Sequence, residues 1–269
     1  MKKFIPILFI LFITACATSP TGRSQLMLIS PEQAITSSKQ AYIQTINSLD
    51  KKNKVDTNPK VTQRVRRITE RLISQAIVMY PNTAKWEWNV KVIDEDETVN
   101  AWCMAGGKMA IYTGLIKKVK PSDDELAQVM GHEIAHALAN HSAEKMSVAM
   151  ASQIGMAALA IAVSDKKYAN AALTGGALAA TVALTLPNSR TAETEADRIG
   201  IELAARAGYD PYAAASLWDK MGKVGNSKTV EFLSTHPSPT NRKQTLLKLA
   251  PQMMKYYKKP KAPNAKKGN

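Results

Sequence analysis

The segment His132-Glu133-Ile134-Ala135-His136 constrains this chain more than any other feature of its sequence. Residues four apart on a helix point to the same side, so the two histidines can present ring nitrogens to one metal ion at the ~2.0 Å that zinc requires. Glu133 lies about 100° round the same turn, from which its carboxylate reaches water on the metal rather than the metal itself. The segment therefore predicts a helix with a metal site, although so short a pattern also arises by chance on ordinary polar helix faces.

A capping pattern marks the start of this helix. Ser122 can accept hydrogen bonds from the free amides of the first turn, and Glu125 can reach back to complete a capping box. We expect the helix to run to about Asn140. His141 lies five residues after His136, off the ligand face, and is expected to be an ordinary polar residue at the helix end.

A second acidic pattern, Glu193-Thr194-Glu195-Ala196-Asp197, follows further along the chain. Its spacing is helical, so Glu193 and Asp197 share a face. The pattern resembles the Glu-x-x-Ala-Asp motif of gluzincin metallopeptidases. The alternatives are a surface carboxylate at Glu193 paired with a neighbouring arginine, a rival ligand at Glu195 and a plain helix-face acid at Asp197.

Several further motifs occur in the order of one family. The chain resembles the gluzincin family that includes HtpX, the CAAX prenyl endopeptidase, BepA and LoiP, and a lipoprotein signal with no evident set of membrane helices favours the LoiP-like branch. The resemblance covers roughly residues 60 to 250. The motifs that carry it, besides the two above, are Asn100-Ala101-Trp102, Gly107-Lys108, Tyr112-Thr113-Gly114-Leu115 and Thr235-His236-Pro237.

The resemblance assigns roles to four residues. It implies that Glu193 is the third zinc ligand, and that Asp197 holds one ligand histidine in a single tautomer and orientation. It places His236 beside the metal, either stabilising the charged intermediate or filling the open coordination position as an inhibitory fourth ligand; the alternative is a structural loop histidine. Arg242 matches a family arginine, with a surface charge at a helix start as the alternative.

These roles imply a zinc-dependent endopeptidase with one Zn²⁺ per chain. Three protein ligands and a water are typical of a catalytic zinc site. Glu133 would remove a proton from the zinc-bound water and later pass it to the leaving amine. The run Asn100, Ala101 and Trp102 would lie on an edge strand that pairs with the backbone of an extended substrate, the alternative being an interior strand.

The first residues have the order of a secretory signal, with Lys2 and Lys3 before an apolar run too short to span a bilayer. Ile13-Thr14-Ala15-Cys16 resembles a bacterial lipobox, in which the signal is cut before a cysteine that receives lipid. We expect a signal over residues 1–15 and attachment to the membrane through lipid on Cys16. Ala17 resembles the pattern sorted to the outer membrane. The alternative is a soluble secreted protein.

The remaining cysteine and the charge restrict the chain further. If Cys16 is acylated, Cys103 has no disulfide partner and is expected to be a small buried residue in a strand. The formal charge is +14, with a lysine cluster near the end that favours a disordered tail over residues 251–269. No nucleic-acid motif accompanies this charge, so we expect no nucleic-acid partner.

The chain reads as an α+β arrangement, mostly helical, with a zincin-like domain and a small antiparallel sheet of hairpins. We expect a polar tether and a helix over residues 16–58 and the catalytic domain over 59–250. Within that domain, two alanine-rich segments over residues 148–186 are each shorter than the ~20 residues of a membrane span, so we expect a buried or interfacial helical hairpin. A lid or a self-association surface is the alternative there.

Two functions follow as hypotheses. The first is an endopeptidase of the bacterial envelope, anchored at the outer membrane and facing the periplasm, that cleaves misfolded or misassembled envelope proteins. Its partners would be unfolded or extended protein substrates. The second is a zinc-binding periplasmic chaperone or assembly factor whose metal is latched by His236. An oligomer is left open.

Overall fold

The computed structural model describes residues 16–163, 186–225, 230–236 and 242–258. The predicted signal over residues 1–15, most of the second alanine-rich segment and the last part of the basic tail lie outside the described residues. The mostly helical α+β arrangement with a small sheet is confirmed.

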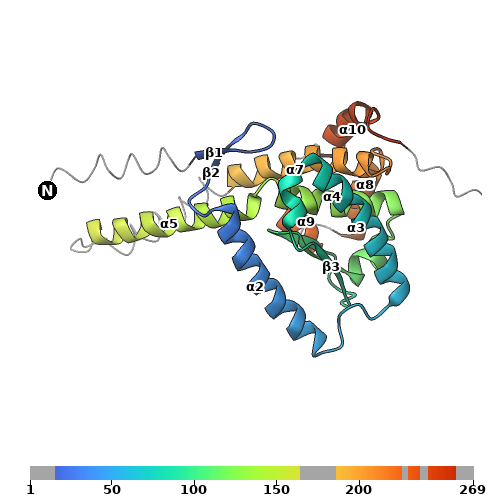
Figure 1. Cartoon of the computed structure of the whole chain (residues 1–269), viewed down its shortest axis with the longest axis horizontal. Coiled ribbons are helices and arrows are strands. Elements are labelled where there is room, and N and C mark those ends of the chain that lie inside the picture. Colours follow the sequence, from blue (N-terminus) through green and yellow to red (C-terminus); the bar gives the residue numbers. More distant parts are fainter. Residues whose placement is uncertain (1–15, 164–185, 226–229, 237–241, 259–269) are drawn as a thin grey trace, which may run out of the picture.

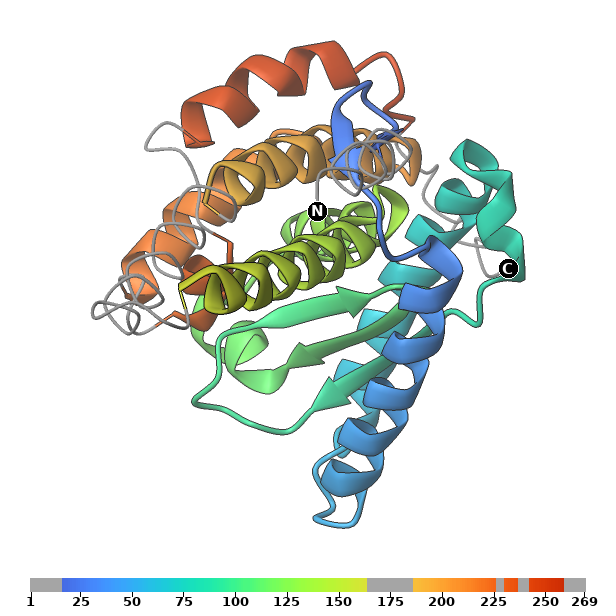
Figure 2. The same cartoon turned by 90° about the vertical axis from the view of Figure 1, so that its left-hand side faces the viewer.

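Helix α4 (Asp123–Leu138) forms the centre of the core, and nearly all of its side chains are buried. Its predicted capping box is present: Ser122 accepts from the amide of Glu125, whose side chain accepts from the amide of Ser122. The helix packs most extensively against α7 (Leu186–Arg206), and both carry predicted metal ligands. Figure 2 shows these helices stacked over one face of the sheet, with α10 (Arg242–Met253) outermost.

The sheet has three strands, β3 (Asn89–Ile93), β4 (Ala101–Met104) and β5 (Lys108–Tyr112), in the order β3-β5-β4. Strands β4 and β5 form the predicted antiparallel hairpin, but β3 and β5 are parallel, so the expectation of an entirely antiparallel sheet is wrong.

The loop after β3 explains this difference, because its acidic residues do not form a hairpin turn. Asp96 accepts hydrogen bonds from Thr113 and Lys117 instead, and Gly114 donates its amide to the carbonyl of Glu95. The loop therefore lies across the end of β5, and the next strand, β4, pairs with the edge of β5 opposite to β3. As a result β4 lies at the edge of the sheet.

Two N-terminal helices brace this core: α2 (Pro31–Asp50), which is the predicted helix before residue 58 and is capped by Ser30, and α3 (Pro59–Met79), capped by Asn58. Helix α3 buries Val65, Ile68, Leu72 and Ala76, which lie at helical spacing, against α4 and the sheet. Short helices complete the element order: η1 (Pro81–Lys85), η2 (Leu115–Val119), α8 (Ala213–Val224) and α9 (Glu231–Thr235).

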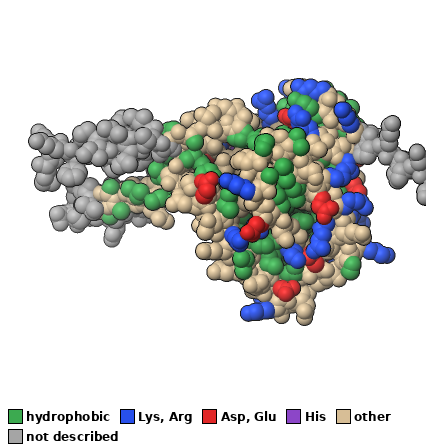
Figure 3. Space-filling view, in the orientation of Figure 1, with side chains coloured by type: hydrophobic (Ala, Val, Ile, Leu, Met, Phe, Trp, Pro, Cys, Tyr) green, Lys and Arg blue, Asp and Glu red, His purple; other side chains and the backbone are tan. Residues whose placement is uncertain are grey.

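Helix α5 (His141–Val163) begins just after the end of α4 and extends beyond the body of the molecule (Figure 1). It contains the first alanine-rich segment, and Met150 and Ile154 on it are exposed. Figure 3 shows hydrophobic side chains along this projection, whereas lysines and arginines gather over the opposite part of the molecule. Among the described helices, none has the length and apolar character needed to cross a membrane.

The region after Cys16 is not a free tether. It forms a β-hairpin of β1 (Cys16–Thr18) and β2 (Ser24–Leu26), which packs against the body of the protein. Arg23 at its turn pairs with the buried carboxylates of Glu144 and Glu195, and two buried acids need such a cation.

The chain end also departs from the expectation of a disordered tail from residue 251. Helix α10 continues through Pro251 to Met253, and the ring of Tyr256 stacks on the guanidinium of Arg206, 3.9 Å away.

Candidate metal centre

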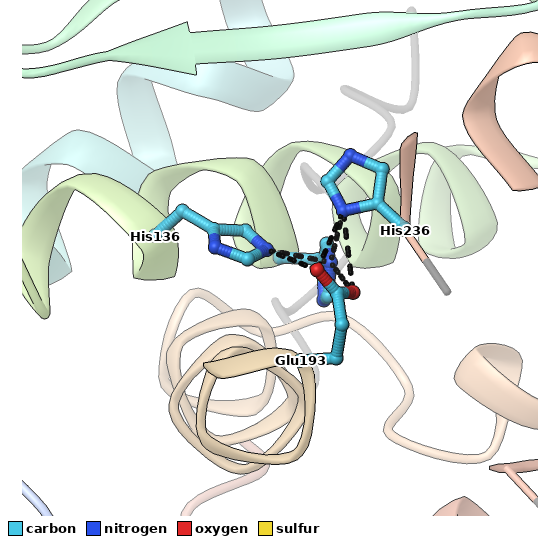
Figure 4. Close-up of side chains that lie close together, drawn as sticks. His136, Glu193 and His236 are labelled. Atoms are coloured by element: carbon cyan, nitrogen blue, oxygen red, sulfur yellow. Dashed lines mark hydrogen bonds and ion pairs between the residues drawn. The ribbon is translucent and has the colours of Figure 1, made fainter. Parts of the chain in front are cut away.

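Four side chains from three parts of the chain meet beside α4. His132 and His136 come from α4, Glu193 from α7, and His236 follows α9 directly. One ligand atom from each lies within 4.8 Å of all the others. Figure 4 shows His136, Glu193 and His236 pointing toward one another. The structure thus brings together the three predicted ligands and His236.

The separations between ligand atoms have the size of a zinc coordination shell. His132 Nε2 lies 3.1 Å from His136 Nε2 and 3.3 Å from His236 Nδ1. Glu193 Oε1 lies 3.3 Å from His136 Nε2 and 3.1 Å from His236 Nδ1. Ligands bound at ~2.0–2.1 Å in a tetrahedron are about 3.3 Å from one another. His236 Nδ1 therefore lies at such a separation from two of the three predicted ligands.

Two members of this cluster have protonation states that bind a cation. Burial raises the pKa of Glu193, but hydrogen bonds from His132, His136 and His236 outweigh it and hold that pKa far below its usual range. Burial lowers the pKa of His136 well below its ordinary value. Glu193 is therefore an anion and His136 a neutral imidazole, which are the forms that bind metals.

Asp197 and Arg242 form a buried pair behind His132. Asp197 Oδ1 lies 3.1 Å from His132 Nδ1 and accepts a 2.6 Å hydrogen bond from Arg242 Nη2. The guanidinium of Arg242 also stacks over Trp218, 4.0 Å from its ring centroid. Because both Asp197 and Arg242 are more than nine-tenths buried, neither is the surface charge that the sequence left open. Asp197 has the position from which a carboxylate fixes the ring of His132.

Glu133 lies beside the cluster rather than in it. It is 3 % exposed, and burial raises its pKa. Its Oε1 atom is 3.4 Å from His236 Nε2 but has no hydrogen-bond partner among the described residues. An unpaired, buried carboxylate oxygen next to a ligand cluster is placed to meet a polar group bound there.

A cleft of about 500 Å³ opens over the cluster. The predicted substrate-binding residues Asn100, Ala101 and Trp102 line it together with Glu133 and His136. They belong to or directly precede β4, which is an edge strand and not an interior one. Cys103 on the same strand is buried, as predicted, and burial raises the pKa of its thiol.

Glu195, the alternative to Glu193 as a ligand, contacts His141 and does not belong to the ligand cluster. One residue near the site was misplaced by reasoning from the sequence: His141 is buried, with its Nδ1 atom 2.8 Å from His136 Nδ1. Helix α4 ends at Leu138 and Asn140 takes a positive φ of 56°, so His141 starts a new helix and does not follow the helical spacing of α4. Asparagine, which tolerates positive φ, was the available signal for this break.

The donor set can be tested against the metal it implies. Three imidazole nitrogens and one carboxylate are ligands that zinc accepts, and one atom from each lies within 4.8 Å of all the others. The unpartnered Glu133 oxygen next to them agrees with a site that binds water or a substrate oxygen. The residues present therefore fit a metal ion of the zinc type.

Known proteins resemble this chain over the same region. The Mitochondrial metalloendopeptidase OMA1 of Arabidopsis thaliana is 40% identical over 159 residues, which are 59% of this chain and 31% of that protein. The OMA1 metalloendopeptidase of Bos taurus is 33% identical over 261 residues, 93% of this chain and 49% of the relative. The Beta-barrel assembly-enhancing protease of Escherichia coli is 32% identical over 192 residues, 69% of this chain and 38% of the relative.

The chain thus spans between about a third and a half of the length of these relatives. The sequence model of peptidase family M48 matches residues 59–250, a range that includes every residue of the four-ligand cluster as well as Glu133, Asp197 and Arg242. On this match over most of its length, the chain belongs to peptidase family M48.

Proposed function

We propose that the protein is a zinc-dependent endopeptidase that cleaves extended segments of other proteins. One observation carries the proposal: four ligand atoms meet in a cleft along an edge strand, and beside them lies a Glu133 oxygen with no hydrogen-bond partner among the described residues. The names of relatives that match most or much of this chain, which are metalloendopeptidases and a protease, support it.

His132, His136 and Glu193 would hold the ion. A bound zinc ion lowers the pKa of water and polarises a carbonyl group. Glu133 takes the proton from the attacking water and delivers it to the nitrogen of the leaving amine. Because burial raises the pKa of Glu133, its conjugate acid keeps this proton more readily than an exposed carboxyl would.

Substrate backbone would pair with β4. The strand lies at the sheet edge, and Asn100 and Trp102 face the same cleft as the ligands. Main-chain pairing reads extended conformation more than sequence, so unfolded or misassembled segments are the expected substrates. The printed name of the Escherichia coli relative, which refers to β-barrel assembly, supports substrates of the cell envelope.

His236 favours a second candidate function. Its Nδ1 atom lies within 3.3 Å of both His132 Nε2 and Glu193, so it would join His132, His136 and Glu193 as a fourth protein ligand in this conformation. Closed sites are typical of structural zinc. A zinc-binding chaperone or assembly factor, in which His236 would be a fourth ligand, is therefore the alternative. In an endopeptidase His236 would lie beside the ion and assist from there.

The deciding experiment compares four purified proteins with one equivalent of zinc: wild type, Glu133→Gln, His236→Ala and the control Glu231→Gln, which changes a carboxyl group of α9 outside the ligand cluster. We expect wild type and control to cut casein or unfolded porin, and Glu133→Gln to lose about 10²-fold or more of the rate while keeping its zinc.

Cleavage by Glu133→Gln at the wild-type rate would refute the mechanism. If only His236→Ala cuts, His236 is a latch. If no variant cuts while clients remain bound, the chaperone function holds.

The location is proposed separately. We infer a lipid anchor on Cys16 and a place at the outer membrane facing the periplasm, from the signal-like start and the lipobox. The bacterial relative supports an envelope protein, whereas the OMA1 relatives are named as mitochondrial. Metabolic labelling with a palmitate analogue should mark the wild type and leave Cys16→Ser unmarked; equal labelling of both would refute the anchor.

A further inference from the structure

The second ring nitrogen of His136 points away from the ligand cluster, into a buried line of polar side chains. His136 Nδ1 lies 2.8 Å from His141 Nδ1, and His141 Nε2 lies 3.2 Å from Glu195 Oε2. His141 is 7 % and Glu195 4 % exposed. Neither residue belongs to the ligand cluster, and the cleavage chemistry proposed above uses neither of them.

If His136 binds a metal through Nε2, only one placement of the hydrogen atoms gives both of these contacts a donor and an acceptor. A neutral imidazole carries a single N–H group, so His136 must carry it on Nδ1 and donate it to Nδ1 of His141. His141 then carries its own hydrogen on Nε2 and donates to Glu195 Oε2. Each donor meets an acceptor, and the ring of His136 is fixed in both tautomer and orientation.

Glu195 is held in turn by the N-terminal hairpin. Its Oε1 atom accepts a 2.7 Å hydrogen bond from Thr21 Oγ1, and its Oε2 atom accepts a 3.0 Å bond from Arg23 Nε. Arg23 also donates from Nη1 and Nη2 to the two carboxylate oxygens of Glu144, each at 2.6 Å. These planar, bidentate contacts set the direction of the guanidinium.

The hairpin is fastened to the helix junction by a further contact. Gln25 Nε2 donates to the carbonyl of Ala139, 2.8 Å away, in the turn that separates α4 from α5, and to Glu144 Oε2 at 2.9 Å. A continuous set of hydrogen bonds therefore joins residues directly after Cys16 to one ligand of the metal centre.

We propose that His141 and Glu195 are positioning residues for the metal ligand His136, and that the hairpin braces them through Thr21 and Arg23. The proposal rests on the metal site of the proposed function. Removing a partner that orients a ligand histidine costs roughly 10- to 100-fold in metal affinity. The strength of zinc binding would thus depend on whether the hairpin after Cys16 is docked.

Two substitutions of the same residue separate positioning from simple packing. In His141→Asn the amide oxygen takes the place of Nδ1 and can still accept from His136, whereas in His141→Gln the amide takes the place of Nε2 and cannot. We measure zinc dissociation constants of the full chain by competition with a chromophoric chelator, and the visible absorption of the Co²⁺-substituted protein. We expect His141→Gln to bind zinc about 10- to 100-fold more weakly with a changed cobalt spectrum, and His141→Asn to stay within about 3-fold of wild type.

A third variant tests the hairpin without altering the helix junction. Arg23→Gln should also weaken zinc binding, whereas Arg206→Gln should not, because Arg206 pairs with Glu202 on the same helix as Glu195 but outside this set. Circular dichroism shows which variants are folded. If the His141 variants do not fold, the zinc affinity of Arg23→Gln tests the proposal instead.

The possible outcomes have separate meanings. If wild type takes up no stoichiometric zinc, the proposed function itself fails. If wild type binds one zinc and the Asn and Gln variants of His141 match it or weaken equally, the positioning role is overturned. Unchanged affinity in Arg23→Gln overturns the bracing by the hairpin.

Discussion

Gly200 of α7 lies directly against the backbone of His132 in α4. A Cβ atom at residue 200 would be 2.9 Å from both the Cα and the amide nitrogen of His132, and one at Gly131 would be 3.0 Å from the carbonyl oxygen of Gly200. The two helices that supply three of the ligands therefore approach one another as closely as backbones without side chains allow.

Gly200→Ala should push these helices apart. We expect a loss of about 1–3 kcal/mol in the free energy of unfolding, from forced overpacking, together with weaker zinc binding. Chemical denaturation and a chelator competition measure the two effects. Gly222→Ala is the matched control in helix α8, because its Cβ would meet nothing within 4 Å, so it should be neutral or slightly stabilising. Equal behaviour of the two variants would contradict this account of the contact.

Replacing Glu193 or Glu195 by alanine should have different effects on zinc binding. Glu193→Ala deletes a ligand, so the purified protein should lose its zinc, whereas Glu195→Ala should keep about one zinc per chain with reduced affinity. Elemental analysis after dialysis measures both. Retention of zinc by Glu193→Ala at the wild-type level would show that the ligand set is wrong.

Arg242→Ala should destabilise the protein strongly. The change leaves Asp197 buried without its 2.6 Å donor, and breaking a buried pair costs about 3–5 kcal/mol. Denaturation of the metal-free protein measures this loss. The neighbouring Lys243→Ala serves as control, since Lys243 and Asp219 form a pair that is about half exposed and worth at most about 1 kcal/mol. Similar losses in both variants would argue against the buried pair.

The metal-free protein should lose stability as pH rises from 6.5 to 9. Burial and the charge of Arg242 lower the pKa of His132, but hydrogen bonds to Asp197 and Glu193 outweigh them and raise it to about 9. A raised pKa stabilises the folded state fully below pH 6.5, and this contribution disappears as pH passes 9. Zinc competes with the same proton, so zinc affinity should increase over that range.

Denaturation of the metal-free protein at several pH values tests this sign, with Asp197→Asn as the comparison. That variant removes the carboxylate partner of His132 and should flatten the dependence. If the stability of the metal-free wild type instead rose from pH 6.5 to 9, the predicted effect of His132 would be contradicted.

Cys103 should resist thiol reagents in the folded protein. Its side chain is 7 % exposed and burial raises its pKa, so little thiolate is present or accessible. In a Cys16→Ser background, Ellman's reagent should react only after denaturant is added. Rapid reaction of the native protein would show that β4 opens readily.

Local patterns predicted the parts of the site that lie on single helices. The capping box at Ser122, the shared face of His132 and His136 and the motif around Glu193 each depend on residues a few positions apart, and the structure brings them together. Arg242 and His236 were found only through their order along the chain. Nothing local distinguishes a buried arginine at a helix start from an exposed one.

Contacts between distant residues were not predictable in this way. Arg23 pairs with Glu144 and Glu195 across 121 and 172 positions, so the docking of the hairpin had no signal in its own sequence. The same reasoning applies to β3, whose parallel pairing with β5 depends on how the loop after it binds Thr113. His141 was misjudged because a single positive φ at Asn140 redirects the chain.

The four residues of the candidate metal centre also bear on the stability of the fold. Cys16 and Cys103 are the two cysteines of the chain, and they do not form a disulfide with each other. His132 and His236 lie 104 positions apart. A metal that joins them would act as a removable cross-link around that long loop and would restrict the unfolded chain in the way that a disulfide does. Chelation would then remove this cross-link, so that loss of the ion and loss of the fold would be coupled.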